Sequence, residues 1–245
     1  MRPILFRWRG LTIYSYAAML YLGLTAALCA ADFAAHDAGL PARSVYVVTL
    51  VLIAIGLFGA RLLFVASHWR FYRAELGRIW KGREGGASQY GGLLLTLAVS
   101  VPCLAAFHLP LGAYWDVGIF AILVGTIFAR VGCLLNGCCS GRATASWFGV
   151  RLPNHSGVWA RRIPTQCLEA ACAATLLGLA IALRHSKPFP GALFLFVVIA
   201  YACSRLVLES AREHEAGAGR FTLQHALSVA IVVSSLITLV ARWPR

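Results

Sequence analysis

Charged residues are scarce in this sequence of 245 residues. Asp, Glu, Lys and Arg make up 13% of the chain, against about 25% in soluble proteins. Lysine is nearly absent and occurs only as Lys81 and Lys187. Hydrophobic residues reach 60%, where soluble domains have about 45–50%. This composition excludes an ordinary soluble domain and predicts an integral membrane protein.

Internal repeats and low-complexity segments are also missing, which argues against a transporter built from inverted repeats. Seven apolar runs are long enough to cross a bilayer as helices, which takes about 17–25 residues. They cover residues 11–31, 45–67, 91–109, 114–135, 168–184, 191–209 and 222–241. We therefore expect an all-α integral membrane protein with about seven transmembrane helices around a lipid-accessible polar cavity. Because the connections are short, residues 1–245 should form a single polytopic membrane domain.

Acidic residues are few, which leaves a formal net charge of +13. In a soluble protein such a charge would suggest nucleic acid as a partner. Here the basic residues lie in loops beside membrane helices, where anionic lipid headgroups are the expected partner. Nearly all of them are arginine, whose planar guanidinium can bind a phosphate through two hydrogen bonds. The sequence therefore predicts an anionic phospholipid, and no nucleic acid, as partner.

Ionisable residues inside the apolar runs are informative, because each costs a few kcal/mol in the membrane and usually faces a cavity or a partner. Arg61, Arg130, Arg205 and Glu209 all lie towards the N-terminal-side ends of their helices, so they should converge in one membrane layer. Tyr201 lies four residues before Arg205 and therefore on the same helix face. Arg205 and Glu209 could be only an intrahelical ion pair. Together with two further arginines, they predict a binding site for a lipid phosphate.

The segment ARVGCLLNGCCSGR, residues 129–142, ends the fourth apolar run with polar residues and glycines. Arg130 should face inward from the last turns of the helix, and Asn136 offers both a donor and an acceptor. The loop that follows carries three aromatic residues of the kind found at membrane interfaces, namely Trp147, Phe148 and Trp159. We expect residues 136–167 to form an interfacial loop inserted between helices four and five.

Five stretches follow one another along the chain in a familiar order. They are YSYAAMLY (14–21), QYGGLLL (89–95), residues 129–142, RRIPTQCLEA (161–170) and GALFLFVVIAYACSRLVLESAR (191–212). The first loosely resembles H-W-Y-G-x-M-Y, and the others resemble H-G-G-L, G-R-x-G-N-F-x-N-G-E-x-x-G-R, R-x-P-[ST]-Q-L-Y-E and a helix with the stripe Y-x-x-x-R-x-x-x-E. These are motifs of the prolipoprotein diacylglyceryl transferases of bacterial inner membranes, which the chain resembles as a divergent member.

The resemblance implies a reaction. Enzymes of this family attach the diacylglyceryl group of phosphatidylglycerol to the thiol of a lipobox cysteine, and glycerol phosphate leaves. The implied partners are phosphatidylglycerol or another anionic phospholipid and a lipobox-containing precursor protein. We expect no cofactor and no metal. The charge distribution alone would place the N-terminus in the cytoplasm, but the family implies the reverse, with a multi-pass chain in the bacterial inner (plasma) membrane and its site toward the outer leaflet.

Residue pattern and resemblance together predict the site. The expected catalytic residues are Arg130, Arg205, Glu209 and Tyr90. The expected substrate-binding residues are Asn136, Gly141, Arg142, Tyr16, Arg61, Asp116, Tyr201, Gln166 and Glu169. The arginines suit stabilisation of a leaving phosphate, and Glu209 should orient Arg205 or Arg130 rather than act as a base.

Three positions depart from the family motifs. Tyr90 replaces the histidine of H-G-G-L, and tyrosine, with a pKa near 10, is a poor base. Cys133 replaces a signature asparagine and Cys138 the signature glutamate. These changes keep two alternatives open, which are a lipid-modifying transferase of the same fold with a different acceptor and a non-catalytic phospholipid-binding membrane protein.

The cysteines of the signature allow four interpretations. Cys133, Cys138 and Cys139, with Cys167, could form a four-thiolate metal site, although their spacing is not a usual zinc pattern and no histidine is near. A disulfide is open to them if this face is periplasmic. A thiol near Arg130 could be reactive, because nearby cations lower a thiol pKa. Plain packing is the fourth interpretation.

Overall fold

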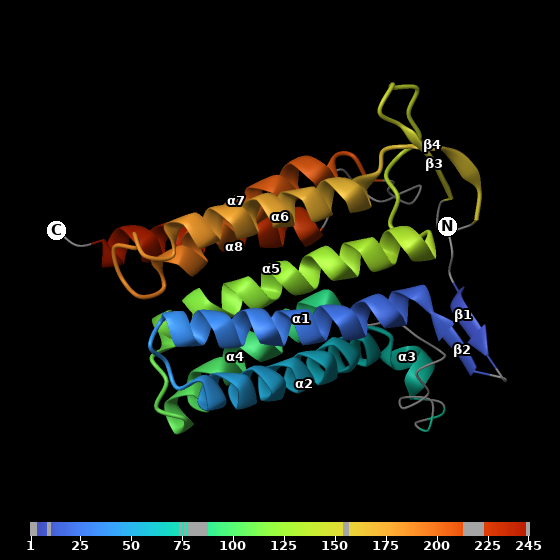
Figure 1. Cartoon of the computed structure of the whole chain (residues 1–245). Helices are drawn as coiled ribbons and strands as arrows, with labels where there is room; N and C mark the ends of the chain where they lie inside the picture. Colours follow the sequence, from blue (N-terminus) through green and yellow to red (C-terminus); the bar gives the residue numbers. More distant parts are fainter. Residues whose placement is uncertain are drawn as a thin grey trace. The chain divides into compact units, whose positions relative to one another are not determined.

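The computed structural model describes residues 4–8, 11–73, 75, 77, 88–153, 157–212 and 223–243. In these residues seven long helices carry the apolar runs, arranged as Figure 1 shows. They are α1 (Ser15–Asp37), α2 (Ala42–Ser67), α4 (Gln89–Ala106), α5 (Leu111–Asn136), α6 (Thr165–Leu183), α7 (Ala192–Glu209) and α8 (Leu223–Arg242). Six are long and apolar enough to cross a membrane, and α4 supplies a shorter apolar helix. The expected all-α membrane protein with about seven spanning helices is confirmed, while its lipid-accessible cavity stays a prediction.

Two short β-hairpins lie outside the long helices and were not expected. β1 (Ile4–Trp8) pairs antiparallel with β2 (Leu11–Tyr14), and β3 (Val150–Pro153) pairs antiparallel with β4 (Trp159–Arg162). The first apolar run therefore begins as a strand, and its helix starts only at Ser15. The β-branched and aromatic residues of β2 favour a strand, a preference that hydropathy alone does not register.

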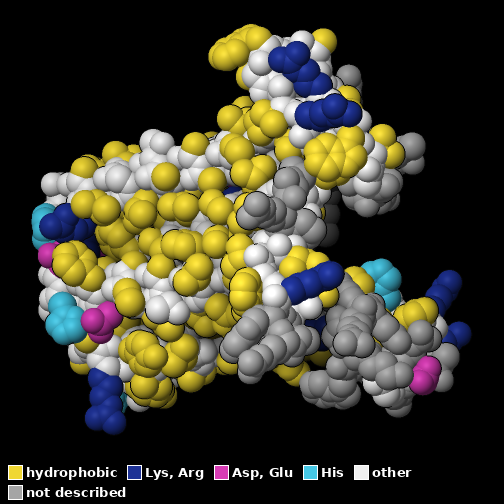
Figure 2. Space-filling view, turned by 45° about the vertical axis from the view of Figure 1, so that its right-hand side comes forward, with side chains coloured by type: hydrophobic (Ala, Val, Ile, Leu, Met, Phe, Trp, Pro, Cys, Tyr) yellow, Lys and Arg dark blue, Asp and Glu magenta, His cyan; other side chains and the backbone are white. Residues whose placement is uncertain are grey.

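The flanks of the helices present hydrophobic side chains, while Lys, Arg, Asp, Glu and His lie towards helix ends (Figure 2). Leu57, Val207 and Val240 are 71%, 71% and 75% exposed. Large apolar side chains exposed over whole helix faces would form patches that soluble monomers rarely carry. Their surroundings in the native protein are therefore lipid chains.

The chain forms two compact units, of which the smaller is Ala35–Tyr114. In it α2 packs closely along α4, and the four-residue helix α3 (Trp69–Tyr72) follows α2. A Cβ atom on Gly59 would lie 2.6 Å from the carbonyl oxygen of Gly91. Small residues allow such close approach, which is a common way for membrane helices to associate.

The larger unit consists of Met1–Ala34 and Trp115–Arg245. In it α7 packs against both α6 and α8. The first turns of α1 pack against the last turns of α5, because a Cβ atom on Gly132 would lie only 3.1 Å from Met19 Cβ and 3.2 Å from the Tyr16 ring. This contact brings the start of α1 to the end of α5, where most of the predicted site residues lie. The expectation of one polytopic domain stays a prediction.

Candidate functional site

The buried carboxylate of Glu169, near the start of α6, forms ion pairs with three arginines. Its Oε2 lies 2.6 Å from Arg130 Nε of α5, and its Oε1 lies 2.9 Å from Arg205 Nη1 of α7. Oε1 also lies 3.2 Å from Nη2 of Arg212, just after α7. The Glu169 side chain is 1% exposed, while those of the arginines are 14%, 14% and 21% exposed. One carboxylate therefore gathers side chains from three parts of the chain and leaves each arginine partly accessible.

Glu209 adds a second carboxylate one turn after Arg205, and its Oε2 lies 3.7 Å from Arg205 Nη2. The ion pairs of the described residues thus join three guanidinium groups to two carboxylates. Among the described residues, the buried Nε of Arg212 has no hydrogen-bond partner. A buried donor without a partner is costly, so this position favours an acceptor such as an anionic ligand.

Arg212 was not among the predicted site residues. The sequence did predict the face of α7 that carries Tyr201, Arg205 and Glu209. Arg212 lies after the end of α7, where its backbone pairs with Gly141. The helical spacing of four therefore could not predict its place in the cluster.

The backbone after α5 is bound tightly to the start of α6. The Thr165 hydroxyl donates to the Cys139 carbonyl at 2.7 Å, and the Gln166 amide donates to the Cys138 carbonyl at 2.6 Å. Both donors are fully buried. Gln166, predicted to bind substrate, is thus seen to hold the loop that follows Asn136. Thr165 was not predicted.

Gly141 is a point of close approach between three segments. Its N–H donates to the Ile163 carbonyl at 2.9 Å, and the next N–H, of Arg142, donates to the Ala211 carbonyl at 2.9 Å. A Cβ atom on Gly141 would lie 2.6 Å from the Ala211 oxygen and 2.8 Å from the Ile163 oxygen. The signature glycine therefore lets the loop connect the start of α6 to the end of α7, beside Arg212.

Three thiols lie at the end of α5. The Sγ atoms of Cys133, Cys138 and Cys139 are all within 4.8 Å of one another, and all eight cysteines of the chain are free. Hydrogen bonds from Cys133 and then from Cys139 hold the pKa of the Cys138 thiol below its ordinary value, and the Asn136 side chain contributes in the same direction. Asn136 thus contacts this cluster.

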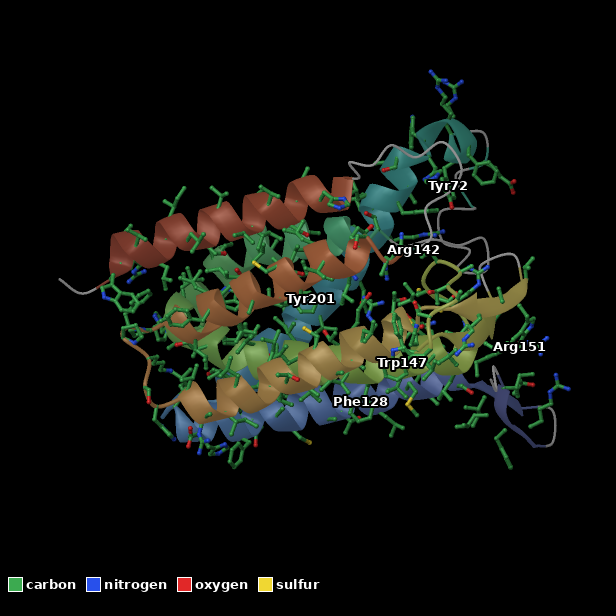
Figure 3. All side chains as sticks on the ribbon, turned by 90° about the horizontal axis from the view of Figure 1, so that it is seen from above. Tyr72, Phe128, Arg142, Trp147, Arg151 and Tyr201 are labelled. Carbon is green, nitrogen blue, oxygen red and sulfur yellow. The ribbon has the colours of Figure 1, made fainter. Side chains whose placement is uncertain are left out.

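Other predicted residues lie nearby. Tyr16 interacts electrostatically with the three thiols and with Arg130, and Tyr201 interacts with Arg130. Figure 3 shows Tyr201 on α7 and Arg142 near the end of the same helix. The Arg142 side chain is exposed.

Asp116 lies at the other end of α5. Its carboxylate accepts hydrogen bonds from the N–H groups of Gly191 at 2.8 Å and Phe194 at 3.0 Å, and it lies 3.2 Å from Lys187 Nζ. A carboxylate in this position satisfies the free N–H groups of the α7 N-terminus. With a rise of 1.5 Å per residue, Asp116 is about 21 Å along the helix from Arg130. The structure therefore gives it a capping contact, and substrate binding by Asp116 stays a prediction.

Two predicted residues belong to the smaller unit. The Arg61 guanidinium lies 5.8 Å from the ring centre of Phe64 and 5.6 Å from that of Tyr72, which are cation–π distances. Its convergence with the arginines of the larger unit stays a prediction. Tyr90 belongs to the first turn of α4, but its side chain lies outside the described part of the structure.

Comparison with known proteins shows that the chain matches a protein family over nearly its whole length. The family described as "Prolipoprotein diacylglyceryl transferase" matches residues 3–241. Three relatives bear the name phosphatidylglycerol–prolipoprotein diacylglyceryl transferase. One from Dehalococcoides mccartyi is 29% identical over 229 residues, which cover 87% of this chain and 83% of the relative. One from Limosilactobacillus reuteri is 27% identical over 256 residues, covering 99% and 91%. One from Rhodopirellula baltica is 32% identical over 160 residues, which cover 63% of this chain and only 32% of that longer protein.

Proposed function

The chain belongs to the prolipoprotein diacylglyceryl transferase family, and from this we propose that it transfers the diacylglyceryl group of phosphatidylglycerol to a lipobox cysteine of prolipoproteins or to a closely related thiol. In this step a carbon–sulfur bond forms between the acceptor thiolate and the glyceryl carbon. The bond from that carbon to the phosphate oxygen breaks, and glycerol phosphate leaves with the electron pair.

The observation that carries the proposal is the set of three arginines on Glu169. Negative charge moves onto the phosphate oxygen as the bond to carbon breaks. Donors that are already oriented towards such a charge lower the barrier without reorganising during the reaction. The three guanidinium groups that meet at Glu169 carry charge of the sign that this step requires.

Glu169 supplies the orientation. It binds Arg130 through Nε and Arg205 through Nη1, and each guanidinium has five N–H donors in one plane. A fixed plane keeps the remaining donors in place for a phosphate. We assign Arg130 and Arg205 to the phosphate and Glu209 to the orientation of Arg205.

The acceptor thiol must lose its proton before it attacks. Tyr90 stands where the family motif has histidine, and a tyrosine hydroxyl donates a hydrogen bond more readily than it accepts a proton near pH 7. We assign Tyr90 to a hydrogen bond with the phospholipid. Removal of the thiol proton then falls to another group or to water.

The proposed location is the bacterial inner membrane, with the site toward the outer leaflet. Seven spanning helices place the two termini on opposite sides, so an external N-terminus predicts a cytoplasmic C-terminus. A fluorescent protein that matures only in the cytoplasm, fused after Arg245, should fluoresce, and alkaline phosphatase at the same position should be inactive. The opposite pair of results would mean that the site faces the cytoplasm.

The activity is tested with protein purified in detergent, phosphatidylglycerol and a lipobox peptide. We expect release of glycerol phosphate together with diacylglyceryl labelling of the peptide. Arg184→Lys is a matched control, because Arg184 follows the opposite end of α6 from Glu169, where its Nη1 donates to the Ile181 carbonyl at 3.0 Å. It should turn over lipid like the unaltered protein.

The departures at Tyr90, Cys133 and Cys138 support one alternative, a transferase of the same fold with a different acceptor. Release of glycerol phosphate without peptide labelling would favour that alternative. Lipid binding without release would identify a phospholipid-binding protein and would contradict the proposed reaction.

A further inference from the structure

The three thiols at the end of α5 are arranged as a set. Their Sγ atoms lie within 4.8 Å of one another. Cys133 is buried, Cys138 is half-buried and Cys139 is exposed, so the set is anchored in the protein but open on one side. Three sulfur atoms around one ion, each at about 2.3 Å from it, would be roughly 4 Å apart. Separations of no more than 4.8 Å need at most a small contraction to reach that geometry.

The ending of α5 explains why residues five apart meet. Gly137 has a φ of 78°, and its N–H donates to the Leu134 carbonyl at 3.2 Å. The N–H of Cys138 donates to the Cys133 carbonyl at 3.1 Å. These two bonds define a Schellman motif, which ends a helix by turning the chain back across its last turn. Cys138 is thereby brought beside Cys133.

Cys139 is held in an unusual conformation. Its φ is 63°, a left-handed value that is uncommon for residues with a side chain. The carbonyls of Cys138 and Cys139 are fixed by Gln166 and Thr165, as described above. Because buried side chains of another helix set this geometry, the thiols are oriented before any ligand arrives.

The donor set indicates the ligand. Among the described residues the cluster contains only sulfur donors, and thiolates select soft ions such as Cu⁺ and Zn²⁺. A disulfide would join two of the three thiols and leave one over, and a bridge between adjacent cysteines would be strained. A metal ion uses all three thiols.

The positive charge around the three thiols also favours a bound metal ion with thiolate ligands. Three thiolates with Zn²⁺ or Cu⁺ carry a net negative charge. Arg130 interacts electrostatically with Cys133 and Cys139, and Arg212 interacts with Cys139. We propose that Cys133, Cys138 and Cys139 form a three-thiolate site for one thiophilic metal ion, Zn²⁺ or Cu⁺. This inference is independent of the proposed transferase reaction.

Metal binding is measured on the full-length protein, purified in detergent with a reductant and stripped with a chelator. Zn²⁺ and Cu⁺ are then titrated separately against a competing chelator, and bound metal and free thiols are counted. We expect one ion per chain for at least one metal and protection of three thiols from alkylation. Loss of a residue that only supports a metal ligand weakens metal binding about 10- to 100-fold. Loss of a direct ligand in Cys133→Ser or Cys138→Ser should therefore weaken binding by about 100-fold or more.

Two sets of variants keep the test independent of folding. Cys29→Ser and Cys203→Ser alter exposed cysteines elsewhere and should leave binding unchanged. Cys139→Gly removes a ligand but suits a positive φ, so it should lose the metal while unfolding at the same temperature as the metal-free parent. The variant with serine at positions 133, 138 and 139 should not bind the metal. Binding by this variant equal to that of the unaltered protein, no binding of either ion by the unaltered protein, or a disulfide within the cluster in freshly isolated protein would each overturn the proposal.

Discussion

Arg130 and Arg205 reach the same carboxylate through different nitrogen atoms, Nε in one case and Nη1 in the other. Lysine has one nitrogen at its tip, so it cannot contact Glu169 and present a planar pair of donors to a phosphate. Removing one donor from a preorganised anion site costs about 10²–10³ in rate. We expect Arg130→Lys and Arg205→Lys each to lower glycerol phosphate release by that factor. Full turnover by both variants would rule out the phosphate-site assignment.

Loss of Glu209 should lower mainly lipid turnover, whereas loss of Glu169 should lower both turnover and stability. Glu209→Gln leaves Glu169 in place and should cost about 10- to 100-fold in lipid turnover, as an orienting residue does. Glu169→Gln removes the charge that Arg130, Arg205 and Arg212 share. Breaking a buried ion pair costs about 3–5 kcal/mol, so this variant should also unfold more easily. Turnover and thermal unfolding in detergent separate the two effects. Near-complete loss of turnover in folded Glu209→Gln would instead identify Glu209 as a base.

At the scale of single elements, the loop between α5 and α6 packs most closely against backbone at Gly141. A Cβ atom on Gly141 would meet two carbonyl oxygens of the backbone and Thr165 Cγ2 at 2.9 Å. Backbone atoms cannot move away cheaply, and overpacking costs about 1–3 kcal/mol. Gly141→Ala should therefore lower the unfolding temperature and the lipid turnover. Gly178→Ala in α6 is the matched control, because nothing lies within 4 Å of that Cβ position and alanine favours a helix. Equal unfolding temperatures would contradict the close packing at Gly141.

Patterns that depend on one element could be predicted from the sequence, and those that depend on several could not. Hydropathy predicted the seven long helices, and the spacing of four predicted that Arg205 and Glu209 share a face of α7. The ion pairs of Glu169 with three arginines could not be predicted, because they depend on how α5, α6 and α7 pack. Arg212 was missed for a related reason, since it lies just outside the apolar run. The β2 strand was missed because its apolar residues merge with those of α1.

Across the whole molecule, two of the three departures from the family motifs prove to be neighbours. Cys133 and Cys138 replace an asparagine and a glutamate of the signature, and in the structure their thiols meet. Arg130 interacts electrostatically with Cys133 and Cys139, and Arg212 interacts with Cys139. A glutamate at position 138 would add a carboxylate to this group. In this chain an anionic metal–thiolate group would supply the negative charge instead.

Restoring the family residues therefore tests two properties at once. The variant Tyr90→His, Cys133→Asn, Cys138→Glu has a histidine that can accept a proton near neutral pH, and it lacks two of the three thiols. Labelling of a lipobox peptide should rise, with a new inflection near pH 6–7 that the unaltered chain lacks, because the reaction would then depend on a neutral histidine. Metal binding should disappear in the same protein. Cys133→Asn with Cys138→Glu, still carrying Tyr90, is the control and should lose the metal without gaining the inflection. If the unaltered chain already labels the peptide as fast as its relatives do, the three departures have not altered the acceptor or the proton transfer.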